Sequence, residues 1–342
     1  MKPVIICGGV GTKMWPLSSP EMPKHFLKFL GEKSLFEMTW EMLRQAYKSE
    51  EIYLQTNAAQ AQLAMLQVPE IVKANVFVEP DHRDQGPATG FMAAKLFQIA
   101  PDEPFFLVQA DVLRTPSEHY LATMKKTEEL IKKTGKLVTG VIKPKFLVRG
   151  VDYIKVKNPA METGVYQVDR WIMREEEGDL QKDFEAGELY LHANHYAWTP
   201  RAMLEAFRRR APDWYGPLQA IIGGADEATE YAKMPKAGIE YMVTKFEAEN
   251  TLVVEANYEW TDFGTWESVF EYQQRNDKFL ISNDKLIEIE AKNNFVKTSD
   301  GKPVAIIGLE NIVVIDGPKG LLVCKKEMTG KVGEVAKILN EK

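Results

Sequence analysis

The sequence predicts an α/β fold with a Rossmann-like, mostly parallel sheet and, after it, a smaller β domain. In the first two-thirds of the 342 residues, short apolar runs alternate with segments of helical period, as in parallel strands joined by helical crossovers. Near the end of the chain, four short β-type runs follow one another at a spacing of roughly ten residues. We therefore expect a large domain over residues 1–280 and a small β domain with a terminal helix over residues 285–342.

The first five expected strands are short runs rich in Val, Ile, Leu and Phe, which suit a sheet covered on both faces. They cover residues 3–7, 52–56, 76–79, 105–110 and 137–142. The helices expected between them cover residues 35–47, 87–99 and 117–133. The first of these helices has a clear start, because Ser34 and Glu37 form a capping-box pattern.

The pattern changes at about residue 150, where strand-like pieces flank a charged helical stretch. We interpret this region as antiparallel insertions of the same domain that shape a substrate pocket. The strand-like pieces cover residues 153–156, 164–171 and 189–198, and the helical stretch covers residues 175–187. Helices are then expected at 200–210 and 225–246, and a strand at 251–256. The small β domain is expected to hold runs at 295–296, 304–307, 312–315 and 321–324, and a helix at 328–339.

The composition is that of an ordinary globular protein, with 45% hydrophobic and 27% charged residues. The net charge of −6 and the lack of a long basic run argue against a nucleic-acid partner. No apolar stretch reaches the length of a membrane span, and the first residues run straight into a strand, so we expect neither a membrane partner nor a signal peptide. Cys7 and Cys324 lie in apolar runs and are expected to be free thiols, which favours the cytoplasm.

A glycine-rich segment directly follows the first expected strand. Glycines there let the backbone turn sharply and bring amide groups close to a phosphate chain. Neither the Walker A pattern nor the dinucleotide fingerprint G-x-G-x-x-G fits this segment. The positive charges of Lys13 and Lys24 are well suited to neutralising phosphates. The segment therefore predicts a phosphate-binding loop made of Gly8, Gly9, Gly11, Thr12 and Lys13.

Two aspartates are candidate metal ligands. Asp111 ends an apolar strand, and open parallel sheets bind their ligands beyond the carboxyl ends of the strands. Asp262 lies between Trp260 and Trp266. Taken by itself, Asp111 is also compatible with a helix N-cap or a loop residue, and an aspartate placed as Asp262 is more often a turn or N-cap residue. Phosphate transfer needs acidic ligands for Mg²⁺ and basic groups for the phosphates. The two aspartates together are therefore candidates for holding one Mg²⁺ ion.

Residues 8–18 with Pro23 and Lys24 resemble the signature of the sugar-1-phosphate nucleotidylyltransferases. The Trp-Pro-Leu-Ser variant at 15–18 and the motif W-x-D-x-G-[ST]-W at 260–266 resemble the mannose-1-phosphate guanylyltransferases among them. The resemblance resumes at 304–324 and covers nearly the whole chain. It implies the fold of the nucleotide-diphospho-sugar transferases with a C-terminal domain similar to a left-handed β-helix.

The resemblance also implies a reaction. GTP and mannose 1-phosphate would give GDP-mannose and pyrophosphate by direct displacement, with Mg²⁺ held by Asp111 and Asp262 and with Lys13 and Lys24 as catalytic cations. Residues 79–88 resemble the loop that faces the nucleobase in this family. That loop adds three candidate nucleotide contacts, Glu79, Gln85 and Pro87.

The sugar side departs from the family pattern. Arg174 stands where the family has a lysine that contacts the sugar phosphate, and Asn194 and Glu240 stand in two rebuilt pocket segments. Lys13 likewise replaces an arginine of the signature. Another hexose 1-phosphate or another NTP therefore stays open, as do a nucleotide-sugar-dependent glycosyltransferase and a regulatory module that only binds nucleotide sugars. A homodimer is a further open alternative.

Overall fold

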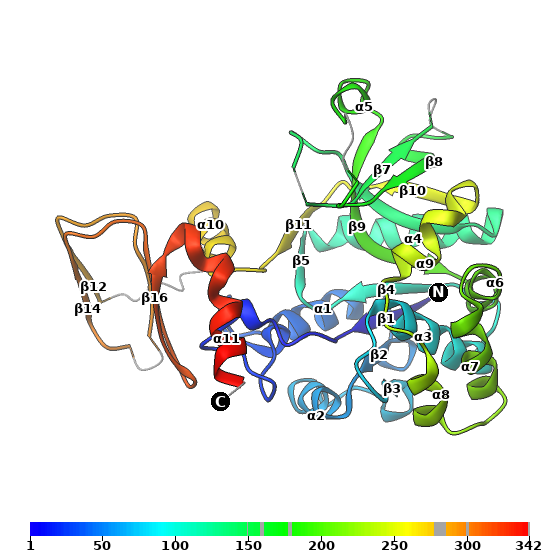
Figure 1. Ribbon diagram of the computed structural model, residues 1–342, viewed down its shortest axis with the longest axis horizontal. Helices are drawn as coiled ribbons and strands as arrows, with labels where there is room; N and C mark the ends of the chain where they lie inside the picture. The colour runs from blue at the N-terminus through cyan, green and yellow to red at the C-terminus, as the bar shows by residue number, and fades with distance from the viewer. Residues whose placement is uncertain (149, 158–160, 177–179, 277–284, 299–300, 341–342) are drawn as a thin grey trace.

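The computed structural model describes residues 1–148, 150–157, 161–176, 180–276, 285–298 and 301–340. A large α/β domain is followed by a small β domain that lies beside it (Figure 1). No helix in these described ranges is long and apolar enough to cross a bilayer.

The large domain is built on a nine-stranded sheet with the order β3-β2-β1-β4-β9-β6-β10-β8-β7. The first four strands in this order are mutually parallel, and β9 runs antiparallel between β4 and β6. β7 also pairs with the start of β9, which closes the second half of the sheet into a ring of pairings. The strands are β1 (Lys2–Ile6), β2 (Tyr53–Thr56), β3 (Val76–Val78), β4 (Phe105–Gln109), β6 (Leu137–Ile142), β7 (Tyr153–Val156), β8 (Val165–Ile172), β9 (Leu189–Trp198) and β10 (Thr251–Glu255).

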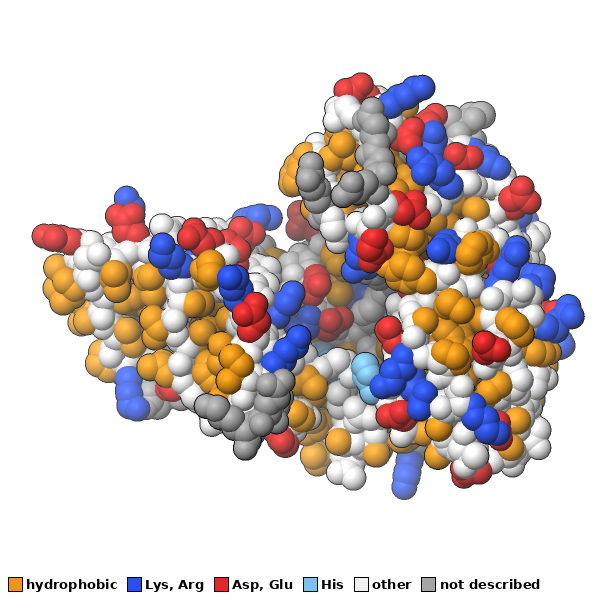
Figure 2. All heavy atoms as spheres, in the orientation of Figure 1, with side chains coloured by type: hydrophobic (Ala, Val, Ile, Leu, Met, Phe, Trp, Pro, Cys, Tyr) orange, Lys and Arg blue, Asp and Glu red, His pale blue; other side chains and the backbone are white. Residues whose placement is uncertain are grey.

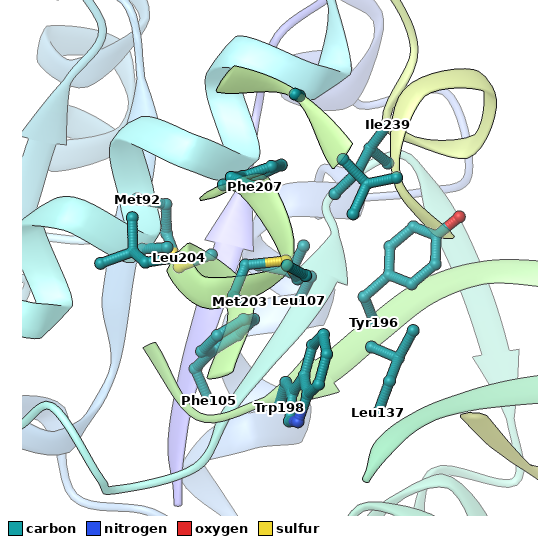
Figure 3. Close-up of a cluster of buried hydrophobic side chains, with 14 of the residues drawn as sticks. Met92, Phe105, Leu107, Leu137, Tyr196, Trp198, Met203, Leu204, Phe207 and Ile239 are labelled. Atoms are coloured by element: carbon teal, nitrogen blue, oxygen red, sulfur yellow. The ribbon is translucent and has the colours of Figure 1, made fainter. Parts of the chain in front are cut away.

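Successive residues of β1 and β4 point to opposite faces of the sheet, so each strand supplies two cores. Val4 and Leu107 pack on one side with α3, α6 and α7, whereas Ile5 and Val108 pack on the other side with α1, α2 and α4. Figure 3 shows the first core, where Met92 and Phe207 lie over strand side chains. The helices are α1 (Leu35–Arg44), α2 (Ala58–Gln67), α3 (Gln85–Ile99), α4 (Ser117–Thr134), α5 (Gln181–Glu185), α6 (Pro200–Arg210), α7 (Pro212–Ile222), α8 (Glu227–Lys233), α9 (Ile239–Met242), α10 (Trp266–Arg275) and α11 (Val332–Asn340).

Six 3₁₀ helices complete the described helical segments. They are η1 (Thr12–Met14), η2 (Lys24–Phe26), η3 (Ser49–Glu51), η4 (Lys73–Asn75), η5 (Thr244–Asn250) and η6 (Lys326–Lys331). The Ser34–Glu37 capping box is present at the start of α1, as the sequence predicts.

Several helical expectations were wrong in extent, and one helix was not expected. The single helix expected at 225–246 is divided into α8, α9 and η5, because Pro235 lacks an amide donor and interrupts the pattern. Helix α7, which begins at Pro212, was not expected. The terminal helix begins at Val332, because residues 326–331 are a 3₁₀ helix. In the charged stretch 175–187, the described helix is only α5, and residues 177–179 lie outside the described residues.

The small β domain contains β12 (Leu286–Ile289), β13 (Phe295–Lys297), β14 (Val304–Ile307), β15 (Ile312–Gly317) and β16 (Gly320–Lys325). β12 pairs in parallel with β14, β13 pairs in parallel with β15, and β15 and β16 form an antiparallel hairpin. Phe295, Val313 and Ile315 share one buried cluster with Met14 and Trp266 of the large domain. The two domains therefore have a common core at their junction.

A two-stranded ribbon joins two distant parts of the chain. β5 (Val112–Thr115) pairs antiparallel with β11 (Glu259–Asp262), so that Asp262 lies opposite Val112. This ribbon was not predicted from the sequence. It is the element that brings the two candidate metal ligands together.

Candidate active site

The candidate site lies where β1 and β4 end. These strands are parallel and adjacent, with Ile6 opposite Gln109, so the glycine loop after β1 emerges beside Asp111 after β4. A pocket of about 280 Å³ opens there. It is lined by Ile6, Gly8, Gly9, Gly11, Lys24, His25, Glu79, His82, Asp84, Gln85, Ala88, Thr89, Leu107, Gln109 and Asp111. Figure 2 shows the molecule hollowed between its two domains, with charged side chains around the hollow.

The glycines of the loop differ in why a side chain is absent. Gly11 has φ +74°, and a Cβ on it would lie 2.4 Å from Cβ of Lys24, so both its conformation and its neighbour exclude a side chain. A Cβ on Gly8 or Gly9 would meet no atom within 4 Å, so neither residue is required by packing. Bare backbone facing an open pocket is what a ligand needs for close approach to amide groups.

Lys24 links the two aspartates. Its Nζ lies 2.9 Å from Oδ2 of Asp111 and 3.1 Å from Oδ1 of Asp262. The lysine side chain is only 8% exposed, whereas the two carboxylates are 41% and 45% exposed. The backbone of Lys24 is held as well, because its N–H donates to the carbonyl oxygen of Val10. A buried cation therefore lies between two carboxylates that face the solvent.

These charges reinforce one another. Burial by itself would lower the pKa of Lys24, but Asp111 and Asp262 outweigh it and raise that pKa above its usual value. The partial burial of Asp111 would likewise raise its pKa, but the Lys24 charge lowers it below its usual value. At neutral pH, Lys24 is therefore a cation and Asp111 an anion, so Lys24 is unsuited to act as a base.

The residues present fit a Mg²⁺ ion. Both aspartates offer hard carboxylate oxygens, and Lys24 contacts one oxygen of each. In the described ranges there is no group of three or more His, Cys, Asp and Glu side chains that could enclose a metal. Mg²⁺ is commonly bound by one or two carboxylates and completed by substrate phosphates and water. Asp111 and Asp262 match that pattern.

The predicted base-side residues occupy different environments. Glu79 and Gln85 line the pocket. Glu79 accepts a hydrogen bond from the Tyr231 hydroxyl, and burial raises its pKa. Pro87 is buried in the first turn of α3, where its missing amide proton costs nothing, and it does not line this pocket.

Lys13 and Thr12 do not line this pocket either. Lys13 is exposed, and both residues belong to η1, which contacts α11 of the small β domain. The structure thus brings Gly8, Gly9, Gly11, Lys24, Glu79, Gln85 and Asp111 together around the pocket, with Asp262 beside Lys24.

A second group of charges surrounds Arg174, just after β8. The carboxylate of Asp152 accepts from the backbone N–H of Arg174 at 2.9 Å, from Nε at 3.1 Å and from Nη2 at 2.5 Å. Asp152 is only 7% exposed. Burial alone would raise the pKa of Asp152, but Arg174 lowers it below its usual value. The buried carboxylate therefore fixes the direction of a half-exposed guanidinium.

Glu240 belongs to the same neighbourhood. It is buried in α9 and accepts a hydrogen bond of 2.6 Å from the Tyr196 hydroxyl. Burial is the main cause that raises the pKa of Glu240. The charge of Asp152 raises this pKa further, whereas the charge of Arg174 lowers it. The backbone of Asn194 belongs to β9, but its side chain lies outside the described residues.

Three residues beside the predicted site residues were not predicted to belong to the site, namely Asp152, His25 and Arg114; the sequence favoured an ordinary loop position for His25. His25 Nε2 lies 3.1 Å from Oε1 of Gln60, and burial lowers the pKa of His25 to about 4, so it is neutral at pH 7. Arg114 is 4% exposed and donates to the carbonyl oxygens of Gln109 and Val112, which bracket Asp111. An isolated Arg or Asp beside a short strand has no sequence pattern of its own, so these roles needed the fold.

Comparisons with known proteins agree with this architecture. The nucleotidyl transferase family model matches residues 2–278, and that of the MannoseP isomerase/GMP-like beta-helix domain matches residues 284–339. The xanthan biosynthesis protein XanB of Xanthomonas campestris is 28% identical over 97% of this chain and 72% of its own length. The mannose-1-phosphate guanylyltransferase of Salmonella muenchen is 25% identical over 98% of this chain and 73% of its own length.

A solved structure has the same fold. The crystal structure of a protein named mannose-1-phosphate geranyltransferase from Thermus thermophilus superposes with a TM-score of 0.84 over 99% of both chains, at 24% identity. The predicted fold class is therefore confirmed, a mostly parallel α/β domain with a C-terminal β-helix domain. The resemblance noted from the sequence motifs is confirmed by the family matches and the named relatives.

Proposed function

Since this chain belongs to the nucleotidyl transferase family, we propose that it transfers the guanylyl group of GTP to mannose 1-phosphate, with Mg²⁺ as cofactor. The observation that carries the proposal is Lys24, buried beneath the glycine loop and in contact with both Asp111 and Asp262. The choice of GTP and mannose 1-phosphate is supported by relatives along nearly the whole chain that are named mannose-1-phosphate guanylyltransferase.

The proposed reaction is a single displacement at the α-phosphorus of GTP. An oxygen of the mannose phosphate forms a bond to that phosphorus, and the bond to the bridging oxygen of pyrophosphate breaks, so that pyrophosphate leaves with the electron pair. The attacking phosphate is already an anion, so no general base is needed. The rate acceleration comes from the alignment of the two phosphates and from the neutralisation of their charge.

The residues near the pocket have distinct proposed tasks. Backbone amides at Gly8, Gly9 and Gly11 bind the triphosphate, and Lys13 approaches it from the rim. Lys24 remains protonated, because its pKa is raised, and stabilises the charge that develops at the reacting phosphates. Asp111 and Asp262 would hold a Mg²⁺ ion, which would supply further positive charge beside the triphosphate.

The base and the sugar are assigned to the remaining residues. Glu79 and Gln85 face the guanine, and Pro87 shapes the start of α3 behind them. Arg174, held in direction by Asp152, binds the sugar phosphate in two-pronged fashion. Glu240 and Asn194 contact sugar hydroxyls. We place the reaction in the cytoplasm, which suits the free thiols of Cys7 and Cys324.

A pyrophosphate-release screen tests the proposal. Four NTPs are each combined with mannose, glucose and galactose 1-phosphate in the presence of Mg²⁺, and every NTP is also incubated without sugar phosphate to measure simple hydrolysis. We expect the highest rate for GTP with mannose 1-phosphate and loss of that rate with EDTA. A tenfold preference for glucose 1-phosphate would overturn the sugar assignment, and no pyrophosphate from any pair would overturn nucleotidyl transfer itself.

A further inference from the structure

We propose that the small β domain positions the phosphate-binding loop of residues 8–13. Helix α11 and the β15–β16 turn form a clamp on residues 12–17, which are the end of this loop and the residues that follow it. This inference rests on the proposed function, because it assigns a task to the domain that contains none of the predicted site residues. Figure 1 shows α11 beside the segment that follows β1, although the two are at opposite ends of the chain.

The first contact of the clamp is made by Gly333 in the first turn of α11. A Cβ on Gly333 would lie 3.3 Å from Oγ1 of Thr12 and 3.4 Å from Cγ of Lys13. The helix backbone therefore lies directly against two predicted nucleotide-binding residues. Val332 and Ala336, on the same side of the helix, are also buried. A larger side chain at 333 has no room unless the loop or the helix moves.

The second contact is the turn between β15 and β16. A Cβ on Gly317 would lie 2.7 Å from Cδ2 of Leu17 and 2.8 Å from the carbonyl oxygen of Pro16. A Cβ on Gly320 would lie 2.9 Å from Cζ2 of Trp15. The hairpin thus packs against the loop through backbone, as α11 does.

The loop is also anchored to α10, the helix that follows Asp262. The indole Nε1 of Trp266 donates to the carbonyl oxygen of Trp15 at 3.0 Å, and Met14 is fully buried among Trp266, Val313 and Val332. On its other side, the loop packs on Lys24 at Gly11. Residues 11–17 therefore lie between the catalytic lysine on one side and the small β domain on the other.

The energetic consequence follows from preorganisation. A loop that binds phosphates through backbone amides must have those amides ordered, and a loop that is free in solution loses conformational entropy when it binds. The clamp orders the loop before GTP arrives. By reciprocity of coupled equilibria, bound GTP must in turn stabilise the clamp.

The variant test uses two glycines three positions apart. Gly333→Leu forces a side chain onto Thr12 and Lys13, whereas a Cβ on Gly330 meets no atom within 4 Å, so Gly330→Leu is the matched control. We expect Gly333→Leu to raise the KM for GTP about tenfold. Its kcat and its KM for mannose 1-phosphate should change less than about threefold, and Gly330→Leu should keep the wild-type constants.

A second measurement keeps the test decisive if Gly333→Leu fails to fold. Hydrogen exchange of the wild-type protein is compared with and without saturating GTP and Mg²⁺. We expect GTP to slow exchange of the amides of α11 and to leave those of β12 and β14, in the same domain, unchanged. Equal exchange in α11 with and without GTP would overturn the clamp.

The outcomes separate the two proposals. If the wild-type protein releases pyrophosphate while Gly333→Leu and Gly330→Leu have the same KM for GTP, the clamp is overturned and the proposed function stands. If the wild-type protein neither binds GTP nor releases pyrophosphate, both are overturned. A general loss of folding would instead lower the melting temperature of Gly333→Leu together with kcat, without a selective rise in the KM for GTP. In that case hydrogen exchange of α11 in the wild-type protein supports or overturns the clamp.

Discussion

The ammonium group of Lys24 lies 2.9 Å from Oδ2 of Asp111, and this pair is the electrostatic centre of the site. Asp262 is brought to the same lysine by the β5–β11 ribbon, in which it lies opposite Val112. The site therefore combines residues from three distant parts of the chain.

The aspartates can be tested by removing one charge at a time. Asp111→Asn and Asp262→Asn should each lower turnover about a hundredfold or more. Each substitution would weaken the binding of a metal ion that can stabilise the charge of the transition state by several kcal/mol. The pyrophosphate-release rate is measured across a Mg²⁺ titration, and removal of Mg²⁺ should abolish it. Asp102→Asn, at an exposed aspartate paired with Arg201, is the control and should turn over normally. A near-normal rate for either site variant at limiting Mg²⁺ would refute that residue as a ligand.

The two lysines should have different kinetic signatures. Lys24→Ala should mainly lower kcat, because its charge is needed as the α-phosphorus rearranges. Lys13→Ala should instead raise the KM for GTP, and Lys13→Arg should be tolerated, since Lys13 is exposed and arginine keeps the positive charge. Steady-state kinetics with varied GTP distinguish the two. A severe loss in Lys13→Arg would show that the site accepts only lysine at this position.

Arg174 and Asp152 should act as one unit on the sugar phosphate. Arg174→Ala should raise the KM for mannose 1-phosphate about tenfold, or about 1.4 kcal/mol, with a much smaller change in the KM for GTP. Asp152→Ala should have a similar effect, and the double variant should be no worse than Arg174→Ala alone, because contacting residues are not additive. Arg170→Ala, at an exposed arginine on β8, is the control. Additive effects would mean that Asp152 acts independently of Arg174.

The same pair predicts a pH dependence of stability. Because the pKa of Asp152 is lower in the folded protein than its usual value near 3.9, its contribution is fully present above about pH 4. The contribution is lost as the pH falls through the folded-state pKa. The melting-temperature advantage of the wild type over Asp152→Asn should therefore be constant between pH 5 and pH 7 and shrink below about pH 4.

Much of the fold was predictable from local pattern. The strands at 105–110 and 137–142 and the helix after Ser34 are set by apolar runs and by a capping box, and they occur within one or two residues of the expected positions except at the end of that helix. The division of residues 225–246 was not foreseen, because the helical period continues across Pro235 in the sequence although the backbone does not.

The glycine loop after β1, the position of Asp111 just after β4 and the motif around Asp262 could be predicted, because each depends on a short run of neighbouring residues. Three contacts could not be predicted in this way: Lys24 with the two aspartates, Asp152 with Arg174, and Gly333 with Thr12 and Lys13. Each of these is a contact between residues distant along the chain, and neither propensity nor periodicity carries information about which distant segments pack together. That choice is made by the burial of the shared cores and by the pairing of strands.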